Sequence, residues 1–209
     1  RGLGDVYKRQ LSMLTRQLIN IPVHLGLDHL PNIYCGVAVF LLYPLYVMDK
    51  DINLCEKIGK SVLLLVFLTA FNLNIPNFIW HGFHYPNSLP CRQSFIYIFF
   101  LLAMCYEAVI NLKNSTNRQL GASLWIAIGL LLIMEELFIN SETEYSFKSV
   151  YISGIFILIY GLLMFIHNNA KFKIPVVLML TFSVSIIECT MNMDATGIGT
   201  TSRTSYLLD

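Results

Sequence analysis

Residues 80–92 read WHGFHYPNSLPCR, and the rest of the chain is organised around this stretch, which we call the central loop. Apolar segments flank it on both sides. It holds two of the five histidines, two of the seven prolines and one of the two tryptophans, and Arg92 closes it at the start of the next apolar segment. A short loop so rich in aromatic, imidazole and cationic groups, fixed between membrane helices, suits an anionic, sugar-bearing or lipid-linked ligand at a membrane surface.

The composition is that of a membrane protein. Of the 209 residues, 56% are hydrophobic and only 13% are charged, and the mean hydropathy is +0.61. A single soluble core of this size cannot bury that much apolar surface, so lipid must cover part of it. The net charge of +1 argues neither for nor against a nucleic-acid partner, but no basic stripe occurs, so we expect none. We therefore expect an all-α, polytopic transmembrane protein whose first partner is the lipid bilayer.

Six apolar segments predict about six membrane spans, at residues 33–48, 61–79, 93–112, 120–139, 150–166 and 174–191. Residues 11–32 are expected to form an outer loop and residues 192–209 an outer tail. Pro44 lies inside the first span, where neighbouring helices must satisfy the freed carbonyl. The second span turns polar at Asn72 and Asn74 and then meets Pro76, a pattern typical of a helix that lines a cavity.

Residues 1–10 do not fit the pattern that follows. Their second half, DVYKRQ, resembles a translated transposon end left by sequencing-library preparation, so we interpret residues 1–10 as a scar and exclude them from the fold. On this interpretation the chain is an internal fragment, and residues 192–209 begin a truncated extracellular segment.

Basic residues are distributed unevenly between alternate connectors. One set has seven and the other has four, namely Lys50, Lys57, Lys60, Lys113, Arg118, Lys171 and Lys173 against Arg16, Arg92, Lys148 and Arg203. By the positive-inside rule the first set is cytoplasmic, which leaves the central loop and both chain ends outside. We accordingly expect the Cys91 thiol to be accessible from outside and the Cys55 thiol only from the cytoplasm.

The central loop offers groups for an anionic ligand. The planar guanidinium of Arg92 can grip a phosphate with two hydrogen bonds, and His81 and His84 can donate to the same anion. Trp80 and Tyr85 can pack on a sugar ring or a lipid chain. The structural alternative is that the aromatic residues form an interfacial belt and Arg92 only reaches lipid phosphate.

Metal and acid–base chemistry are less well supported. His81 and His84 have the spacing of a metal pair, but no nearby carboxylate or cysteine completes a site, so we predict no metal. Glu135 and Glu136 could supply a general base, although acids at a helix end are usually just solvated. Glu188 lies deeper within a span, where ionisable groups usually face a cavity.

Several segments resemble the bacterial YfhO membrane proteins in their order and spacing. The longest are residues 31–36 (PNIYCG), 79–87 (IWHGFHYPN) and 89–95 (LPCRQSF), and residues 106–108 (YEA) and 201–203 (TSR) fit the same pattern. The resemblance covers nearly everything from residue 11 to residue 209.

This resemblance implies a multi-pass glycosyltransferase of the GT-C type in a bacterial cell membrane. Such enzymes move a sugar from a polyprenyl-phosphate donor to a cell-envelope polymer, such as lipoteichoic acid, on the outer face, and no cofactor is implied. The catalytic acid usually lies in a first large outer loop that these residues do not include. The catalytic residues are therefore unknown, and we expect the fragment alone to be inactive.

Within that scheme the central loop supplies the expected binding residues. The lipid phosphate would be held by Arg92, His81 and His84, and the sugar or lipid would pack on Trp80, Tyr85 and Asn87. Two alternatives stay open: a transporter or flippase for polyprenyl-linked substrates, which would use the same loop without bond chemistry, and a non-catalytic membrane scaffold.

Overall fold

The computed structural model describes residues 13–22, 31–80, 82–84, 91, 93–139, 147–169 and 174–195. Their secondary structure consists of helices, as predicted: η1 (Leu14–Gln17), α2 (Val39–Met48), α3 (Leu54–Asn72), α4 (Asn74–Trp80), α5 (Ser94–Ile110), η2 (Leu112–Asn114), α6 (Asn117–Ile139), α7 (Phe147–Asn168) and α8 (Ile174–Ala195). The expected scar at residues 1–10, most of the expected outer tail and part of the expected outer loop lie outside the described residues.

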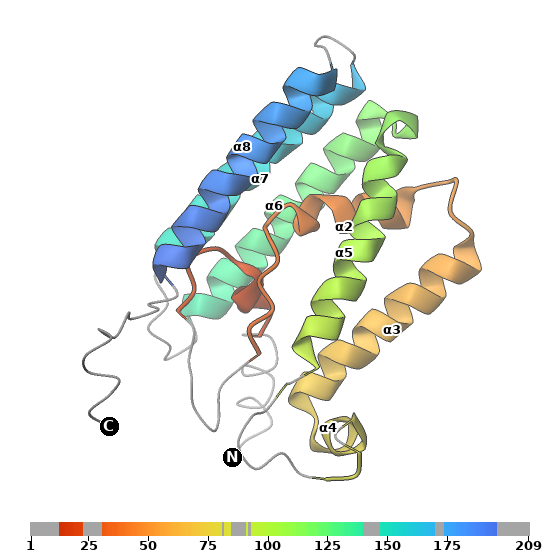
Figure 1. Ribbon diagram of the computed structural model, residues 1–209, viewed down its shortest axis with the longest axis vertical. Coiled ribbons are helices and arrows are strands. Elements are labelled where there is room, and N and C mark those ends of the chain that lie inside the picture. Colours follow the sequence, from red (N-terminus) through yellow and green to blue (C-terminus); the bar gives the residue numbers. More distant parts are fainter. Residues whose placement is uncertain are drawn as a thin grey trace, which may run out of the picture.

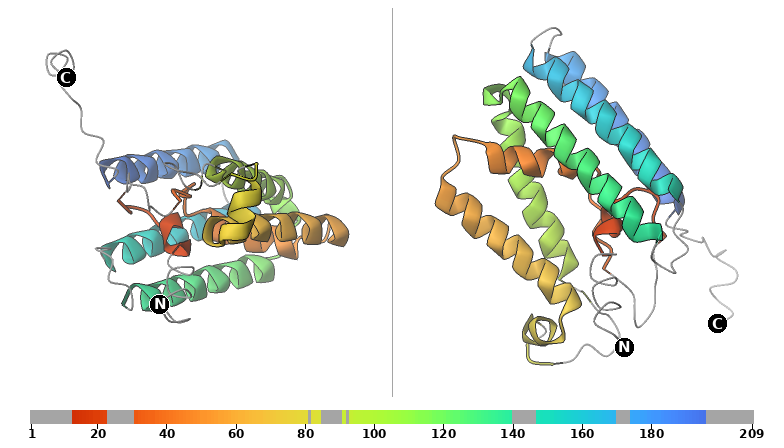
Figure 2. Two further views of the ribbon diagram at one scale, coloured as in Figure 1. Left: turned by 90° about the horizontal axis from the view of Figure 1, so that it is seen from below. Right: turned by 180° about the vertical axis from the view of Figure 1, so that it is seen from behind.

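The helices form a tilted bundle with one short helix across its middle (Figure 1). Helix α6 packs on α7, and α7 packs on α8, while α2 crosses the bundle between α5 and α6. Helix α3 packs on α5 at the edge of the bundle that lies furthest from α8 (Figure 2). The main core therefore lies where α2 meets α5, α6 and α7, and it contains the buried side chains of Leu41, Leu101, Ala127 and Ile157.

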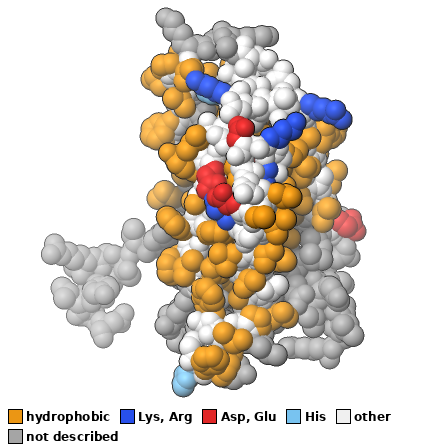
Figure 3. Space-filling model, turned by 90° about the vertical axis from the view of Figure 1, so that its right-hand side faces the viewer, with side chains coloured by type: hydrophobic (Ala, Val, Ile, Leu, Met, Phe, Trp, Pro, Cys, Tyr) orange, Lys and Arg blue, Asp and Glu red, His pale blue; other side chains and the backbone are white. Residues whose placement is uncertain are grey.

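The two ends of the bundle differ in character. At one end, which we call the α4 end, lie α4, the start of α5, the end of α8 and the segment around η1 (Figure 1). Long-range hydrogen bonds hold that segment in place: the backbone N–H of Ile19 donates to Ser153 Oγ at 3.1 Å, and that of Asn20 donates to Asn192 Oδ1 at 3.1 Å. The opposite end, which we call the lysine end, carries Lys50 in the α2–α3 connector. Lys and Arg side chains gather towards it (Figure 3).

Three of the described helices, α6, α7 and α8, are long and apolar enough to cross a membrane. Their spanning windows are Asn117–Glu136, Lys148–Asn168 and Ile174–Met193. Large apolar side chains on them are exposed, such as Trp125 at 74% and Phe182 at 68%. Lipid, and not water, is the solvent that suits such surfaces. The polytopic membrane fold is confirmed, whereas the count of six spans stays a prediction, because α2 and α5 are shorter.

The first predicted span is much shorter than the sequence suggests. Residues 31–36 are not helical, and Gly36 turns the chain with φ +94°, a backbone conformation that glycine adopts without steric cost. The ten residues of α2 cover about 15 Å, roughly half of a bilayer core. Pro44 removes the helical donor to the Phe40 carbonyl, and next to it the Ser123 hydroxyl of α6 donates to the Leu41 carbonyl at 2.6 Å.

The second predicted span is divided. Helix α3 starts at Leu54 and not at residue 61, because the Asn53 side chain caps it by accepting from the Cys55 N–H at 3.1 Å. It ends at Asn72, Leu73 is extended, and α4 resumes with Pro76 in its first turn, where a missing N–H costs nothing. The break falls inside the polar stretch that the sequence analysis singled out.

Candidate functional site

Helix α4 ends in a motif that explains the residues after it. The N–H of Phe83 donates to the Phe78 carbonyl at 2.9 Å, and the N–H of Gly82 donates to the Ile79 carbonyl at 3.1 Å, the two bonds of a Schellman C-cap. Gly82 supplies the positive φ of +67° that this cap needs. The Phe78 and Phe83 rings meet edge to face at 5.9 Å, which is the hydrophobic contact that accompanies the motif. The chain therefore leaves the helix before His84.

Two of the six predicted ligand residues in the central loop can be placed. Trp80 is the last residue of α4; it is 41% exposed and packs edge to face on Phe67 at 4.9 Å. His84 is exposed beyond the helix cap. The other predicted residues, His81, Tyr85, Asn87 and Arg92, lie outside the described residues.

Cys91 is buried, so the expectation of an accessible thiol is wrong. Its side chain is 6% exposed, and Sγ lies 3.8 Å from the Phe71 carbonyl oxygen at the end of α3. Burial raises the pKa of this thiol to about 11. The cysteine therefore packs the start of α5 against α3 and does not face the surroundings.

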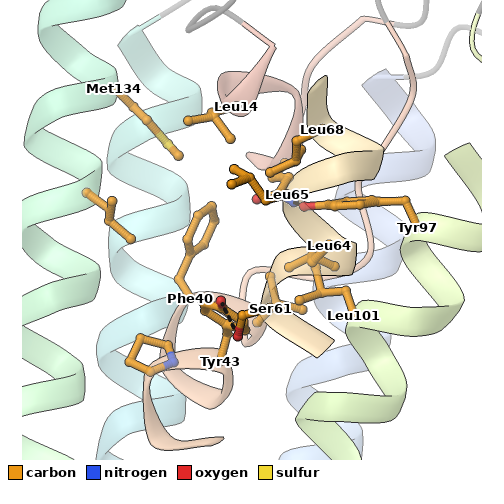
Figure 4. Close-up of a pocket in the computed structure, with 14 residues that line it drawn as sticks. Leu14, Phe40, Tyr43, Ser61, Leu64, Leu65, Leu68, Tyr97, Leu101 and Met134 are labelled. Carbon is orange, nitrogen blue, oxygen red and sulfur yellow. Dashed lines mark hydrogen bonds between the residues drawn. The ribbon is translucent and has the colours of Figure 1, made fainter. Parts of the chain in front are cut away.

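A cavity of about 200 Å³ lies between η1, α2, α3, α5 and α6 (Figure 4). Most of its lining is apolar, with Leu14, Phe40, Leu64, Leu101 and Met134 among the side chains that line it. Leu65 of α3 also lines it, although 59% of that residue is exposed. The cavity therefore opens beside α3, towards the surface of the bundle that lipid would cover.

Two hydrogen-bonded pairs interrupt this apolar lining. Gln17 of η1 donates from Nε2 to Tyr97 Oη at 2.6 Å, and both residues are buried. Tyr43 of α2 donates from its hydroxyl to Ser61 Oγ at 3.2 Å (Figure 4). Tyr97 lies in the first turn of α5, at the α4 end, while Ser61 lies in the lysine-end half of α3. The cavity is thus an apolar slot with a polar pair towards each end.

Gln93 is a buried polar side chain that the sequence analysis did not single out. It directly precedes α5 and is 2% exposed, yet neither Nε2 nor Oε1 has a hydrogen-bond partner among the described residues. Gln93, Tyr97 and Leu101 follow one another at four-residue intervals and therefore lie along one side of α5. A pattern search could have found this side, because Gln93 and Tyr97 precede a run of ten residues, from Ile98 to Glu107, whose first eight are apolar.

Glu188 is buried, but it does not face the cavity. Its side chain is 3% exposed, and Oε1 accepts from the Tyr34 hydroxyl and the Val37 N–H, both at 2.7 Å. Oε2 accepts from the Tyr160 hydroxyl at 2.6 Å, and Tyr160 also lies 3.1 Å from Ser185 Oγ. The carboxylate therefore joins the segment before α2 to α7 and α8, a structural role that differs from the cavity-facing one expected for an ionisable group in a span.

Among the described residues, no group of three or more histidine, cysteine, aspartate or glutamate side chains is placed to hold a metal ion. At the lysine end, Lys60 bridges Glu56 at 2.6 Å and Glu107 at 2.5 Å. These charges pair with one another away from the cavity, and none of the residues that line the cavity carries a formal charge.

Comparison with known protein families shows which family the chain belongs to. The family described as bacterial membrane protein YfhO matches residues 10–207. The chain belongs to the YfhO family. Comparison with curated proteins and with solved structures found no match. The resemblance drawn from the sequence is thus confirmed over nearly the whole chain, and YfhO membership agrees with the three helices long enough to span a membrane.

Proposed function

We propose that this chain is part of a membrane glycosyltransferase that moves a sugar from a polyprenyl-phosphate donor to a cell-envelope polymer such as lipoteichoic acid. Membership of the YfhO family makes a glycosyltransferase role plausible. The observation that carries the proposal is the apolar cavity, because it opens beside α3 and has a buried glutamine–tyrosine pair at the α4 end. Such a slot suits an amphiphile with a long hydrocarbon chain and a polar head.

The orientation of the chain is part of the proposal. The α2–α3 connector, the start of α3, η2 and the start of α6 meet at the lysine end. They hold the described basic residues Lys50, Lys57, Lys113 and Arg118, against Arg16 in η1 and Lys148 in α7. By the positive-inside rule this end faces the cytoplasm and the α4 end faces outwards. The polar head of a lipid held in the cavity would then emerge on the outer face, where a cell-envelope polymer is available as the acceptor.

The central loop would complete the site at the α4 end. Arg92, His81 and His84 would hold the lipid phosphate, and the sugar or the first part of the lipid would pack on Trp80, Tyr85 and Asn87. Cys91, which is buried, fixes the start of α5 next to this loop.

The reaction follows from the chemistry of the donor. An acceptor hydroxyl attacks the anomeric carbon, the bond from that carbon to the phosphate oxygen breaks, and a carboxylate takes the hydroxyl proton. The leaving phosphate gains negative charge in the transition state, so fixed cations and hydrogen-bond donors beside it lower the barrier. The carboxylate is unknown; Glu188 is not proposed for this role, because both of its oxygens already accept hydrogen bonds.

A transporter or flippase of polyprenyl-linked substrates is the second candidate. The observation that favours it is the break between α3 and α4 at Leu73, since transporters build their substrate sites from interrupted helices. A glycosyltransferase moves the sugar from the lipid to the polymer, whereas a transporter or flippase moves the intact lipid-linked sugar to the other side of the membrane.

A pair of tryptophan variants in a full-length YfhO protein that contains this chain tests the proposal. Leu65→Trp obstructs the mouth of the cavity, whereas Val66→Trp places the same side chain at the next position of α3, which is 45% exposed and does not line the cavity. Displacing the donor from its reacting position costs about 100-fold in rate. In proteoliposomes with a radiolabelled polyprenyl-phosphate sugar, we expect Leu65→Trp to reduce transfer to the acceptor polymer by at least about tenfold.

Val66→Trp should retain transfer close to that of the unmodified protein. Equal rates for the two variants would remove the cavity from the mechanism. Movement of the labelled lipid across the bilayer without transfer to polymer would favour the transporter.

A further inference from the structure

Among the described residues, Gln93 carries a buried amide whose donors and acceptor are both unused. A primary amide offers two N–H donors and a carbonyl acceptor, and burying it without partners costs more than a hydrogen bond contributes on balance. Gln93 is 2% exposed, and within the described part of the chain both of its polar atoms lack a partner. A buried polar group without a partner calls for an explanation, and a bound ligand is one.

The surroundings of Gln93 indicate where that partner would come from. Four residues further along α5, Tyr97 lines the cavity, and four residues beyond it Leu101 does so as well. A helix rises about 6 Å over four residues, so these three buried side chains form a column about 12 Å long. The column changes from an alkyl group to a hydroxyl to an amide as it approaches the α4 end.

This order matches the parts of a glycosylated polyprenyl phosphate. The hydrocarbon would lie beside Leu101, and the Tyr97 hydroxyl, which accepts from Gln17, still has its own O–H to donate to a phosphate oxygen. Gln93 would then lie level with the sugar, which is attached to the other side of the phosphate. A phosphate accepts hydrogen bonds only, whereas a sugar hydroxyl both donates and accepts and can therefore use both sides of the amide.

We propose that the Gln93 amide, one turn beyond the cavity-lining Tyr97, binds a hydroxyl of the sugar carried by the lipid donor, so that the protein distinguishes a glycosylated polyprenyl phosphate from the bare lipid phosphate. This inference rests on the proposed function, since it assumes that the cavity holds the prenyl chain. It goes further in assigning sugar recognition to a residue buried at the start of α5.

The test compares two lipids and two glutamine variants in a full-length YfhO protein that contains this chain. The lipids are a polyprenyl phosphate and the same lipid carrying one hexose, and binding is measured from nanodiscs by native mass spectrometry. Gln93→Leu removes the amide. Gln119→Leu is the matched control, because Gln119 lies at the lysine end and its amide accepts from Thr116 and donates to the Met48 carbonyl, each at 2.8 Å.

We expect the unmodified protein to bind the hexose-carrying lipid about tenfold more tightly than the bare lipid, which is the effect of one or two hydrogen bonds. In Gln93→Leu the two lipids should bind equally tightly. The binding of the bare lipid and the resistance of the protein to unfolding should not change. Gln119→Leu should do the reverse, keeping the ratio and lowering the stability.

Each other outcome contradicts the inference in a recognisable way. An unchanged ratio in Gln93→Leu means that the amide does not contact the sugar, and an equal loss for both lipids means that it contacts the phosphate. A loss of stability in Gln93→Leu without ligand means that a buried water or the fold itself uses the amide. Failure of the unmodified protein to bind either lipid overturns the proposed function as well.

Discussion

The buried carboxylate of Glu188 gives the sharpest prediction about stability. It anchors residues 34–37 to α7 and α8, and that segment leads directly into α2, whose Phe40 and Tyr43 line the cavity. Replacing Glu188 should therefore loosen the wall of the proposed lipid site as well as destabilise the bundle.

The magnitude follows from the hydrogen bonds that each substitution removes. Glu188→Ala leaves the Tyr34 hydroxyl and the Val37 N–H without their acceptor, whereas Tyr160 keeps Ser185 at 3.1 Å. Each buried donor without a partner costs about 1–3 kcal/mol, so the free energy of unfolding should fall by about 2–6 kcal/mol. Glu188→Gln keeps an acceptor oxygen in place and should cost only about 1–2 kcal/mol.

Unfolding in mixed micelles, followed by the loss of helical circular dichroism as SDS is added, measures this difference. Glu135→Ala is the control, because Glu135 also accepts a tyrosine hydroxyl, that of Tyr151 at 3.1 Å, but at an exposed site. It should change the free energy of unfolding by no more than about 0.5 kcal/mol. If Glu188→Ala and Glu135→Ala unfold at the same SDS fraction, the carboxylate does not hold the segment as we describe.

Two further predictions concern the backbone and the thiols. Gly36→Ala should lower the free energy of unfolding by about 1–2 kcal/mol, because alanine is strained at a φ of +94°. The added Cβ would not clash, since it would lie 3.9 Å from Glu188 Oε1. No loss of stability in the SDS titration would mean that the turn relaxes freely. In permeabilised cells at pH 8, a maleimide should label the exposed Cys55. It should leave Cys91 unlabelled until the protein is denatured, because that thiol is buried and its pKa is raised to about 11. Rapid labelling of Cys91 in the native protein would contradict its packing against α3.

Much of the helical pattern could be predicted from the sequence, because hydropathy reports how apolar a segment is. The last three spans agree with α6, α7 and α8 to within four residues at each end. The first does not, because hydropathy cannot separate an apolar extended segment from an apolar helix. Residues 31–36 are held in a non-helical path by the turn at Gly36 and by Glu188, which lies 151 residues beyond Val37.

The sequence directed attention to one part of the candidate site but not to the cavity, because local composition does not report contacts between residues far apart in the chain. The density of aromatic and basic groups indicated the central loop, but most of its residues lie outside the described part of the chain, so its role in binding stays a prediction. The cavity depends on packing between helices, and the Gln17–Tyr97 hydrogen bond in its lining joins residues 80 positions apart. Gln93 is distinguished by having no described partner, a property that only the fold reveals.

The most direct test of the central claim is photo-crosslinking with a polyprenyl phosphate that carries a diazirine in its isoprene units near the phosphate. If the cavity holds this lipid, peptide mapping will find the adducts on the cavity-lining faces of α3 and α5, near Leu65, Tyr97 and Leu101, and excess unlabelled lipid will suppress them. Adducts spread over the exposed face of α8, around Phe182, with none enriched at the cavity, would contradict the account.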